Sequence, residues 1–161
     1  MPITAAVRAL RAAGVVFVPH LYDYEEKGGT RRSSALLGVD EHAVVKTLVM
    51  AATRDGGRPT PLVVLMHGDR EVSTKKLARD LGAKTLAPCD PKTAERHSGY
   101  LVGGTSPFGL KTAMPIYVER SVLALPLIYI NGGKRGFLVA LDPRELARVL
   151  APTAVDAAQP P

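Results

Sequence analysis

The amino-acid sequence predicts a single α+β domain in which short helices flank one bent, mixed β-sheet. Three observations favour this class. Candidate strands and helices are interspersed without the regular strand–helix–strand rhythm of a doubly wound sheet. Several strands are joined by turns too short for the crossover that parallel neighbours need. The 161 residues show no repeat and no linker, and this length suits one hydrophobic core.

The first half of the chain opens with a predicted helix over residues 4–13. Thr4 is its N-cap, and Gly14 ends it. Residues 15–24 are rich in β-branched and aromatic side chains, which indicates a strand. The further elements expected here are a loop at 25–30, a helix at 31–38, and strands at 44–52 and 62–67 joined by the Gly- and Pro-rich turn 54–61.

The second half contains the clearest helix signals. Residues 90–99 and 142–150 both begin with Asp followed by Pro at the first helical position, and Gly99 ends the first of them. Residues 151–161 lack bulky apolar side chains, so we expect a disordered tail after a domain that spans residues 1–150. The remaining elements expected are a helix at 73–82 and strands at 83–88, 114–119, 127–130 and 136–141.

Composition and charge limit the classes of function. Hydrophobic residues make up 46% of the chain, and no apolar run approaches the roughly 18 residues of a membrane span. The N-terminus lacks a secretory apolar block, so we expect a cytoplasmic protein without a membrane partner. The net charge of +6 favours polyanionic partners. General DNA binding would rest on this charge alone, because no helix-turn-helix or zinc motif is present.

The reactive residue types form no familiar catalytic or metal motif. Cys89 is the only cysteine, and we interpret it as a small structural residue. The four histidines have no metal-ligand spacing. Ser106 does not lie in a nucleophile elbow, and the Gly-rich segments do not match phosphate-loop or dinucleotide patterns. The sequence therefore predicts neither a metal nor a cofactor.

Lys46 is unusual because it lies inside the apolar run AVVKTLVM. An unpaired ammonium is costly to bury, so this strand has at least one open side at that position. Composition favours a half-buried strand whose lysine reaches water. The alternative is a cation that faces a cleft and holds an anionic or carbonyl substrate.

Two Gly-rich segments, YLVGGTSPFG (100–109) and NGGKRGF (131–137), allow two interpretations. Glycine permits tight turns, and it also lets a ligand come close to bare backbone. In the second segment Lys134 and Arg135 accompany backbone N–H groups, a combination suited to phosphate. A plain hairpin with solvated charges is the favoured interpretation of that segment from composition.

Three stretches, in this order and spacing, resemble the YbaK-type aminoacyl-tRNA editing domains. They are VVKTLV (44–49), GYLVGGTSPFG (99–109) and YINGGKRGFLVALDPRELARVL (129–150). The similarity runs from about residue 5 to residue 150, and it is greatest to the bacterial Cys-tRNA(Pro) deacylases. Each motif alone is weak, whereas three in register are specific. The resemblance implies the YbaK-like editing fold and a freestanding trans-editing hydrolase.

The resemblance also implies roles for individual residues. Lys46 corresponds to the essential lysine, and Gly103 and Gly104 correspond to a turn whose backbone holds the ester carbonyl and the α-amino group. Leu138 departs from the family, since some relatives carry an acidic or polar residue there, and the loop 25–30 is shorter and less aromatic than expected. The implied substrate-binding residues are Tyr22, Thr47, Thr105, Ser106, Pro107, Lys134 and Arg135.

The implied substrate is tRNA(Pro) mischarged with cysteine, and prolyl-tRNA synthetase is a possible partner. Since the chain offers no convincing nucleophile, we expect the cysteinyl sulfur of the substrate to attack its own ester. Two alternatives stay open. One is editing of alanine or serine on tRNA. The other is a catalytically silent adaptor for tRNA or for prolyl-tRNA synthetase.

Overall fold

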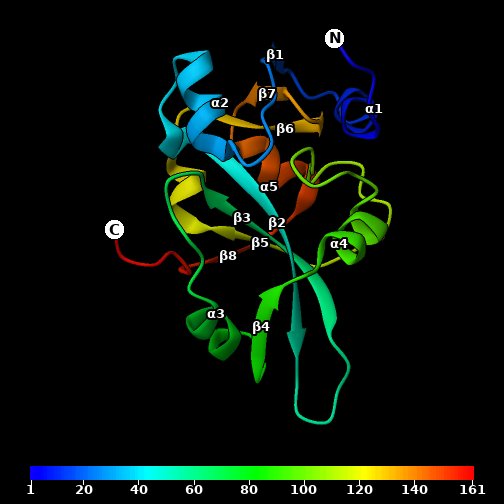
Figure 1. Cartoon of the computed structure of the whole chain (residues 1–161), viewed down its shortest axis with the longest axis vertical. Helices are drawn as coiled ribbons and strands as arrows, with labels where there is room; N and C mark the ends of the chain where they lie inside the picture. The colour runs from blue at the N-terminus through cyan, green and yellow to red at the C-terminus, as the bar shows by residue number, and fades with distance from the viewer.

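Eight strands form one mixed sheet in the computed structural model, which describes residues 1–161 (Figure 1). The strand order is β1-β7-β6-β2-β3-β5-β8, and β4 pairs with β2 outside this path. The strands are β1 (Val18–Leu21), β2 (Val44–Thr53), β3 (Thr60–His67), β4 (Thr85–Pro88), β5 (Ile116–Glu119), β6 (Ile128–Lys134), β7 (Phe137–Leu141) and β8 (Thr153–Val155). The helices are α1 (Ala5–Ala12), α2 (Gly29–Leu37), α3 (Thr74–Asp80), α4 (Pro91–Ser98) and α5 (Arg144–Leu150), with short 3-10 turns η1 (Glu41–Ala43) and η2 (Arg120–Ala124).

The long strand β2 has a gap along one of its edges. On one side it pairs antiparallel with β3 from Val45 to Ala52. On the other side it pairs with β6 only at 44–45 and with β4 only at 50–53. Residues 46–49 therefore have no strand neighbour on that edge.

Two hydrophobic clusters cover the two faces of the sheet. Side chains of successive strand residues point to opposite faces. In β3, Val63 and Leu65 belong to the larger cluster, which also holds Phe108 and Phe137. Leu62, Val64 and Met66 belong to the smaller cluster, whose helical cover comes from Leu77 and Ala78 of α3. Burial on both faces explains why the central strands have such continuous apolar sequences.

The predicted α+β class and mixed sheet are confirmed, and α1, α3 and α4 begin where their caps indicated. Helix α2 begins at Gly29, inside the loop expected at 25–30, and α5 begins at Arg144, after the Pro143 expected as its first residue. Thr4, Ser73 and Asp90 each accept a backbone N–H at a helix N-terminus. Most strands agree with the expected ranges to within two residues at each end, and two differ by more. The strand expected at 15–24 is reduced to β1, and β6 continues through the Asn-Gly-Gly segment to Lys134. None of the helices has the length and apolar character needed to cross a membrane.

Residues 151–161 differ from the disordered tail that we expected. Thr153–Val155 form β8, which pairs in parallel with β5. Val155 and Ala157 are buried, and the Glu119 carboxylate accepts the N–H groups of Ala157 and Ala158. Small side chains are sufficient here because the tail adds backbone pairing to a sheet edge and fills a narrow space beside α3. The described domain therefore extends beyond residue 150.

Candidate active site

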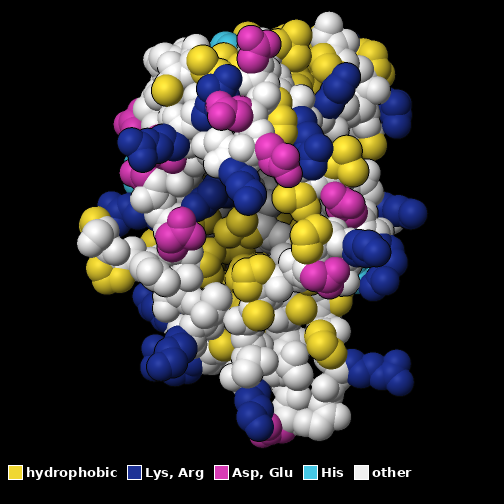
Figure 2. Space-filling model, in the orientation of Figure 1, with side chains coloured by type: hydrophobic (Ala, Val, Ile, Leu, Met, Phe, Trp, Pro, Cys, Tyr) yellow, Lys and Arg dark blue, Asp and Glu magenta, His cyan; other side chains and the backbone are white.

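A cavity of about 600 Å³ opens at the gap in β2. Figure 2 shows a hollow near the middle of this face, with hydrophobic side chains on its floor and Lys and Arg side chains along its upper rim. Its walls come from β2, from α2 and the loop before it, from the end of β4, from the β6–β7 hairpin, and from Val102, Gly103 and Thr105. Among the residues predicted from the sequence, the cavity is lined by Tyr22, Lys46, Thr47, Gly103, Thr105 and Arg135.

Lys46 lies on the cavity wall with its side chain 18% exposed. Its ammonium donates to the Arg70 carbonyl at 2.6 Å and lies 3.3 Å from a Glu71 carboxylate oxygen. The loop between β3 and α3 therefore holds the cation in place. An ammonium has three N–H donors, so one remains for a ligand.

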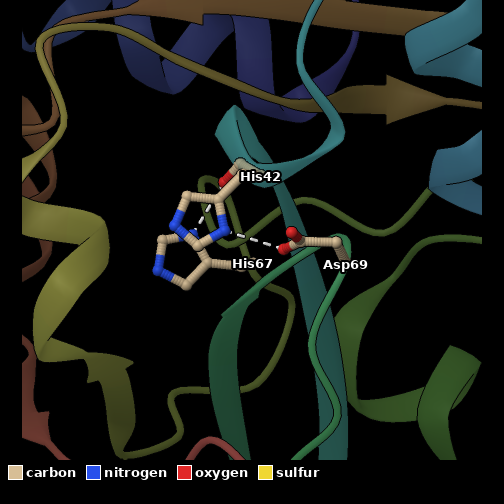
Figure 3. A group of neighbouring side chains, drawn as sticks. All are labelled: His42, His67 and Asp69. Carbon is tan, nitrogen blue, oxygen red and sulfur yellow. Dashed lines mark hydrogen bonds and ion pairs between the residues drawn. The ribbon is translucent and has the colours of Figure 1, made fainter. Parts of the chain in front are cut away.

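The loop that holds Lys46 is itself fixed by polar contacts. The Thr30 hydroxyl lies 3.1 Å from the Gly68 carbonyl and 2.7 Å from a Glu41 carboxylate oxygen. His42 Nδ1 and the nearest Asp69 carboxylate oxygen lie 2.8 Å apart, and this contact is drawn as a dashed line in Figure 3. This contact lowers the pKa of Asp69, although partial burial alone would raise it. The carbonyl that binds Lys46 is thus placed before any substrate arrives.

His67 lies behind this loop and supports it. Its ring stacks on that of His42 at 3.7 Å with an angle of 7° between the planes (Figure 3). Its Nδ1 lies 2.7 Å from the His42 carbonyl oxygen and its Nε2 lies 2.6 Å from the Ser121 hydroxyl. Nδ1 must donate to the carbonyl, and in the neutral ring Nε2 then accepts from the Ser121 hydroxyl. Burial lowers the pKa of His67 in agreement with this state.

His42, His67 and Asp69 bring their polar atoms within 4.8 Å of one another, a spacing compatible with a metal ion. The ring geometry opposes this use. Both nitrogens of His67 already have protein partners, and nearly parallel stacked rings direct their lone pairs side by side instead of toward one point. We therefore interpret the group as a structural support for the loop 68–71.

Thr47 lines the cavity and carries an unsatisfied polar group. Its hydroxyl is the one buried side-chain polar atom without a hydrogen-bond partner. The backbone N–H and C=O groups of Thr47 also face the gap. In a strand, residues two apart direct these groups to the same edge, and the Val49 carbonyl accepts the Cys89 N–H on the side of the gap. Buried polar groups are normally paired, so this hydroxyl marks a place for a polar atom of a ligand.

The two glycines of the segment 100–109 have different surroundings. Gly103 lines the cavity with φ of +92°, and a Cβ there would lie 2.5 Å from the Tyr24 hydroxyl. Its carbonyl accepts from Asn131, and its N–H has no acceptor within the chain. Gly104 does not line the cavity. Its N–H already donates to the Leu101 carbonyl, and a Cβ there would lie 2.8 Å from the backbone nitrogen of Arg135. The backbone role predicted for both glycines therefore suits Gly103, whereas Gly104 lets two loops pack.

The other predicted residues divide into cavity wall and support. Ser106 and Pro107 are buried behind the wall, and the Ser106 hydroxyl accepts the Phe108 N–H. Arg135 donates from Nε to the Val102 carbonyl at 2.8 Å and lies over the Tyr24 ring. Lys134 lies outside the main cavity.

Tyr22 and Cys89 are both protonated on the cavity wall at neutral pH. Burial and the neighbouring Tyr24 raise the pKa of Tyr22, so its phenol is neutral. Burial, together with the nearby Asp90 carboxylate, raises the pKa of the Cys89 thiol. A raised pKa keeps Cys89 a weak nucleophile. Its position on the wall was not predicted.

Tyr24 and Asn131 also have roles that sequence reasoning did not identify. Tyr24 contacts both Gly103 and Arg135. Asn131 donates to the Gly103 carbonyl, while its side-chain oxygen accepts the N–H groups of Gly133 and Lys134. It thus joins the two Gly-rich segments. The sequence signal for this role was the position of Asn131 at the start of an Asn-Gly-Gly run, because Asn side chains in turns commonly form hydrogen bonds with nearby backbone.

Leu138 and the loop 25–30 are the two departures from the family noted in the sequence. Leu138 is 4% exposed and contributes apolar surface to the cavity. Glu25, Glu26 and Lys27 line the cavity from the loop side. An apolar patch in the same cavity as Thr47 suits a small side chain with limited polarity.

The sequence matches the family model described as aminoacyl-tRNA editing domain over residues 26–149. A protein of Enterococcus faecalis, EbsC, provisionally named as a Cys-tRNA(Pro)/Cys-tRNA(Cys) deacylase, is 30% identical over 144 residues, which cover 89% of this chain and 85% of that protein. A proline–tRNA ligase of Nitratidesulfovibrio vulgaris is 37% identical over 86 residues, 53% of this chain. The matched region is 14% of that ligase, so this chain corresponds to a small part of it.

Two solved structures share the fold. The hypothetical protein APE2540 superposes with a TM-score of 0.84 at 23% identity, covering 96% of this chain and 99% of the other. A candidate trans-editing enzyme for prolyl tRNA synthetase superposes with a TM-score of 0.81 at 22% identity, covering 99% of this chain and 100% of the other. These likenesses establish the architecture.

Proposed function

The chain belongs to the aminoacyl-tRNA editing domain family, and we propose that it cleaves the ester that links cysteine to tRNA(Pro). Family membership confirms the resemblance that three motifs indicated in the sequence. The choice of cysteine is supported by the name of the E. faecalis relative. On this proposal the substrate is a product of mischarging by prolyl-tRNA synthetase, and the net charge of +6 favours the approach of a tRNA.

The observation that carries the proposal is the arrangement around the gap in β2. Lys46, Thr47 and Gly103 come from distant parts of the sequence and line one cavity. They offer, in turn, a cation, an unsatisfied hydroxyl and a free backbone N–H. Such groups suit an ester carbonyl and an α-amino group, while the apolar floor suits a small side chain. A volume of about 600 Å³ lies within the usual range for small-molecule sites.

We propose further that the substrate supplies the nucleophile. The only thiol of the chain, Cys89, has a raised pKa, and no Ser–His pair faces the cavity. A cysteine thiol has a pKa near 8.5, so a few per cent is thiolate at neutral pH. The cysteinyl sulfur attacks its own ester carbonyl, the carbon–oxygen bond to ribose breaks, and the thiol proton passes to the ribose oxygen. The product is a strained thiolactone, so positioning must supply much of the acceleration.

The geometry assigns supporting roles in this step. The remaining N–H of the Lys46 ammonium favours the thiolate form and the developing negative charge. The N–H of Gly103 is free to stabilise the oxyanion, and a single such donor is worth roughly 3–4 kcal/mol in other enzymes. Lys46 is held by the Arg70 carbonyl, so its position changes little between the free and the bound protein.

Single-turnover deacylation of Cys-, Ser-, Ala- and Pro-tRNA(Pro) tests the function and the mechanism together. We expect Ser-tRNA(Pro), which differs by one atom but has a far poorer nucleophile, to be cleaved orders of magnitude more slowly than Cys-tRNA(Pro). Cys89→Ala should have full activity. Equal rates for serine and cysteine would contradict the substrate-assisted step and indicate an activated water. Turnover at substoichiometric protein separates an enzyme from a silent adaptor.

A further inference from the structure

A second, smaller cavity of about 300 Å³ lies beside the main one. It is lined by Pro2, by residues 21–23 and by residues 134–136. Tyr22 and Arg135 line both cavities, so the two are neighbours with a shared wall. A ligand that leaves the main cavity past Arg135 therefore reaches the smaller one directly.

The smaller cavity has groups of three chemical kinds. Lys134 is exposed and forms no ion pair. Arg135 donates from Nε to the Val102 carbonyl, and its two terminal nitrogens form no hydrogen bond or ion pair within the chain. Asp23 contributes a carboxylate with no hydrogen-bond or ionic partner within the chain. Leu21, which is 60% exposed, offers an apolar surface. Two cations, one acceptor and one apolar wall match the phosphate, the polar edge and the face of a nucleotide.

The shape of this cavity is set before binding. The Tyr22 N–H donates to the Gly136 carbonyl at 2.9 Å, which ties the chain after β1 to the β6–β7 turn. A Cβ at Gly136 would lie 2.6 Å from the Tyr22 carbonyl oxygen, so the two backbones are in close contact. A site whose walls are already fixed loses less entropy when a ligand binds.

We propose that the smaller cavity binds the cytidine nucleotide that precedes the terminal adenosine of an aminoacylated tRNA, an assignment that rests on the proposed function. Lys134 and Arg135 contact the phosphate that links the two nucleotides. The Asp23 carboxylate accepts a hydrogen bond from the exocyclic amino group of cytosine, a pairing that carboxylates make with this base. Leu21 packs against the base.

The proposal makes the site general for tRNA, because every tRNA ends in cytidine, cytidine and adenosine. Selection among tRNAs must then come from other parts of the surface. It also predicts rejection of uridine at this position, since uridine presents a carbonyl oxygen where cytidine has its amino group. That oxygen would face the Asp23 carboxylate without a proton between them.

Three chemically acylated substrates test the proposal on the full-length protein: cysteinyl-adenosine, cysteinyl-CpA and cysteinyl-UpA. We expect kcat/KM for cysteinyl-CpA to exceed that for each of the other two by roughly tenfold or more, the discrimination of one good base contact. Asp23→Asn should bring the CpA-to-UpA ratio close to one, because an amide can donate to the uridine oxygen. Asp55→Asn, the same change at an exposed position in the β2–β3 turn, should leave the ratio as in the wild type.

The outcomes separate this proposal from the proposed function. If cysteinyl-adenosine and cysteinyl-CpA are cleaved with equal efficiency, the nucleotide site is overturned while the deacylase function stands. If cysteinyl-CpA is favoured but Asp23→Asn leaves the CpA-to-UpA ratio unchanged, the contact with Asp23 is overturned. If neither these compounds nor Cys-tRNA(Pro) is cleaved, the proposed function fails and the nucleotide site fails with it.

Discussion

The two walls of the main cavity are built in different ways. The strand wall consists of residues 46–49 of β2, and the loop 68–71, which does not line the cavity, holds Lys46 through the Arg70 carbonyl. The loop wall consists of residues from the two Gly-rich segments, namely Val102, Gly103, Thr105, Asn131 and Arg135. The strand wall is anchored by β3 and by side-chain contacts of Thr30, His42 and His67. The loop wall is held by backbone packing at Gly104 and by the Asn131 side chain.

This difference suggests a division of labour. The strand wall carries the cation and the unsatisfied hydroxyl, and a strand paired along its other edge places them with little freedom. The loop wall shapes the cavity and offers one free N–H, and its close packing depends on glycines, which have no side chain. Substitutions in the strand wall should therefore reduce the rate, whereas those in the loop wall should first reduce stability.

Lys46→Ala should have the largest effect. We expect at least about a hundredfold loss of single-turnover deacylation, roughly 2.7 kcal/mol of barrier, with an unchanged thermal midpoint. Lys84→Ala is a matched control, since that lysine is exposed and its N–H binds the carbonyl of Thr53, at the end of β2 away from Lys46. If the folded Lys46→Ala protein has the wild-type rate, the cation has no part in the mechanism, and the strand wall does not supply the catalytic groups.

Gly104→Ala should act through stability. The added Cβ would lie 2.8 Å from Arg135 N and 2.9 Å from Lys134 C, both backbone atoms that cannot easily move. We expect a loss of about 1–3 kcal/mol in the free energy of unfolding, measured by chemical denaturation. Gly57→Ala, whose Cβ would lie 3.3 Å from the nearest atom in an exposed turn, is the control. Equal stability of the two variants would show that the loops do not depend on this close packing.

Thr47→Val should separate activity from stability within the strand wall. The substitution keeps the shape and removes the unpaired hydroxyl, so stability should stay equal or rise. Deacylation should fall about tenfold if the hydroxyl binds the substrate, the effect of roughly one hydrogen bond. Thr53→Val, on the same strand beyond the cavity, should be neutral in activity. An unchanged rate for Thr47→Val would leave the unpaired hydroxyl without a function.

The smallest expected effect is on the pH dependence of stability behind the strand wall. Burial lowers the pKa of His67 in the folded protein, so the unfolded chain takes up a proton near the ordinary value of 6.5 and the folded protein does not. Stability is therefore fully present above that pH and is lost as the pH falls below it. The temperature of the thermal midpoint should fall when the pH is lowered from about 7.5 to about 5.5. In His67→Gln the midpoint should depend less steeply on pH. Parallel slopes for the two proteins would assign the acid sensitivity to other groups.

Local patterns predicted most of the helices and strands, because helix caps and apolar runs depend only on residues that are close in the sequence. The Asp-Pro start of α4 and the apolar sequence of β2 are examples. The tail was missed because Ala157 becomes buried only through the sheet edge that it meets. The different roles of Gly103 and Gly104 could not be separated, since they depend on Tyr24 and on the turn at 134–135, far away in sequence. Lys46 and the Gly-rich segments were conspicuous in the sequence itself, and the family resemblance added their roles, whereas the Thr47 hydroxyl needed three-dimensional neighbours to be recognised as unpaired.

The strand order also has a consequence for how the protein is made. β1 pairs with β7, so Val18 meets its partner Ala140 only after the intervening strands and helices have been synthesised. β5 likewise waits for β8, which follows it only after η2, β6, β7 and α5. Such non-local pairing slows folding, because the chain loses the entropy of closing long loops before the strand contacts stabilise it. The nascent chain therefore exposes the apolar faces of β2 and β3 during elongation, a period in which a chaperone or rapid completion of synthesis protects it from aggregation.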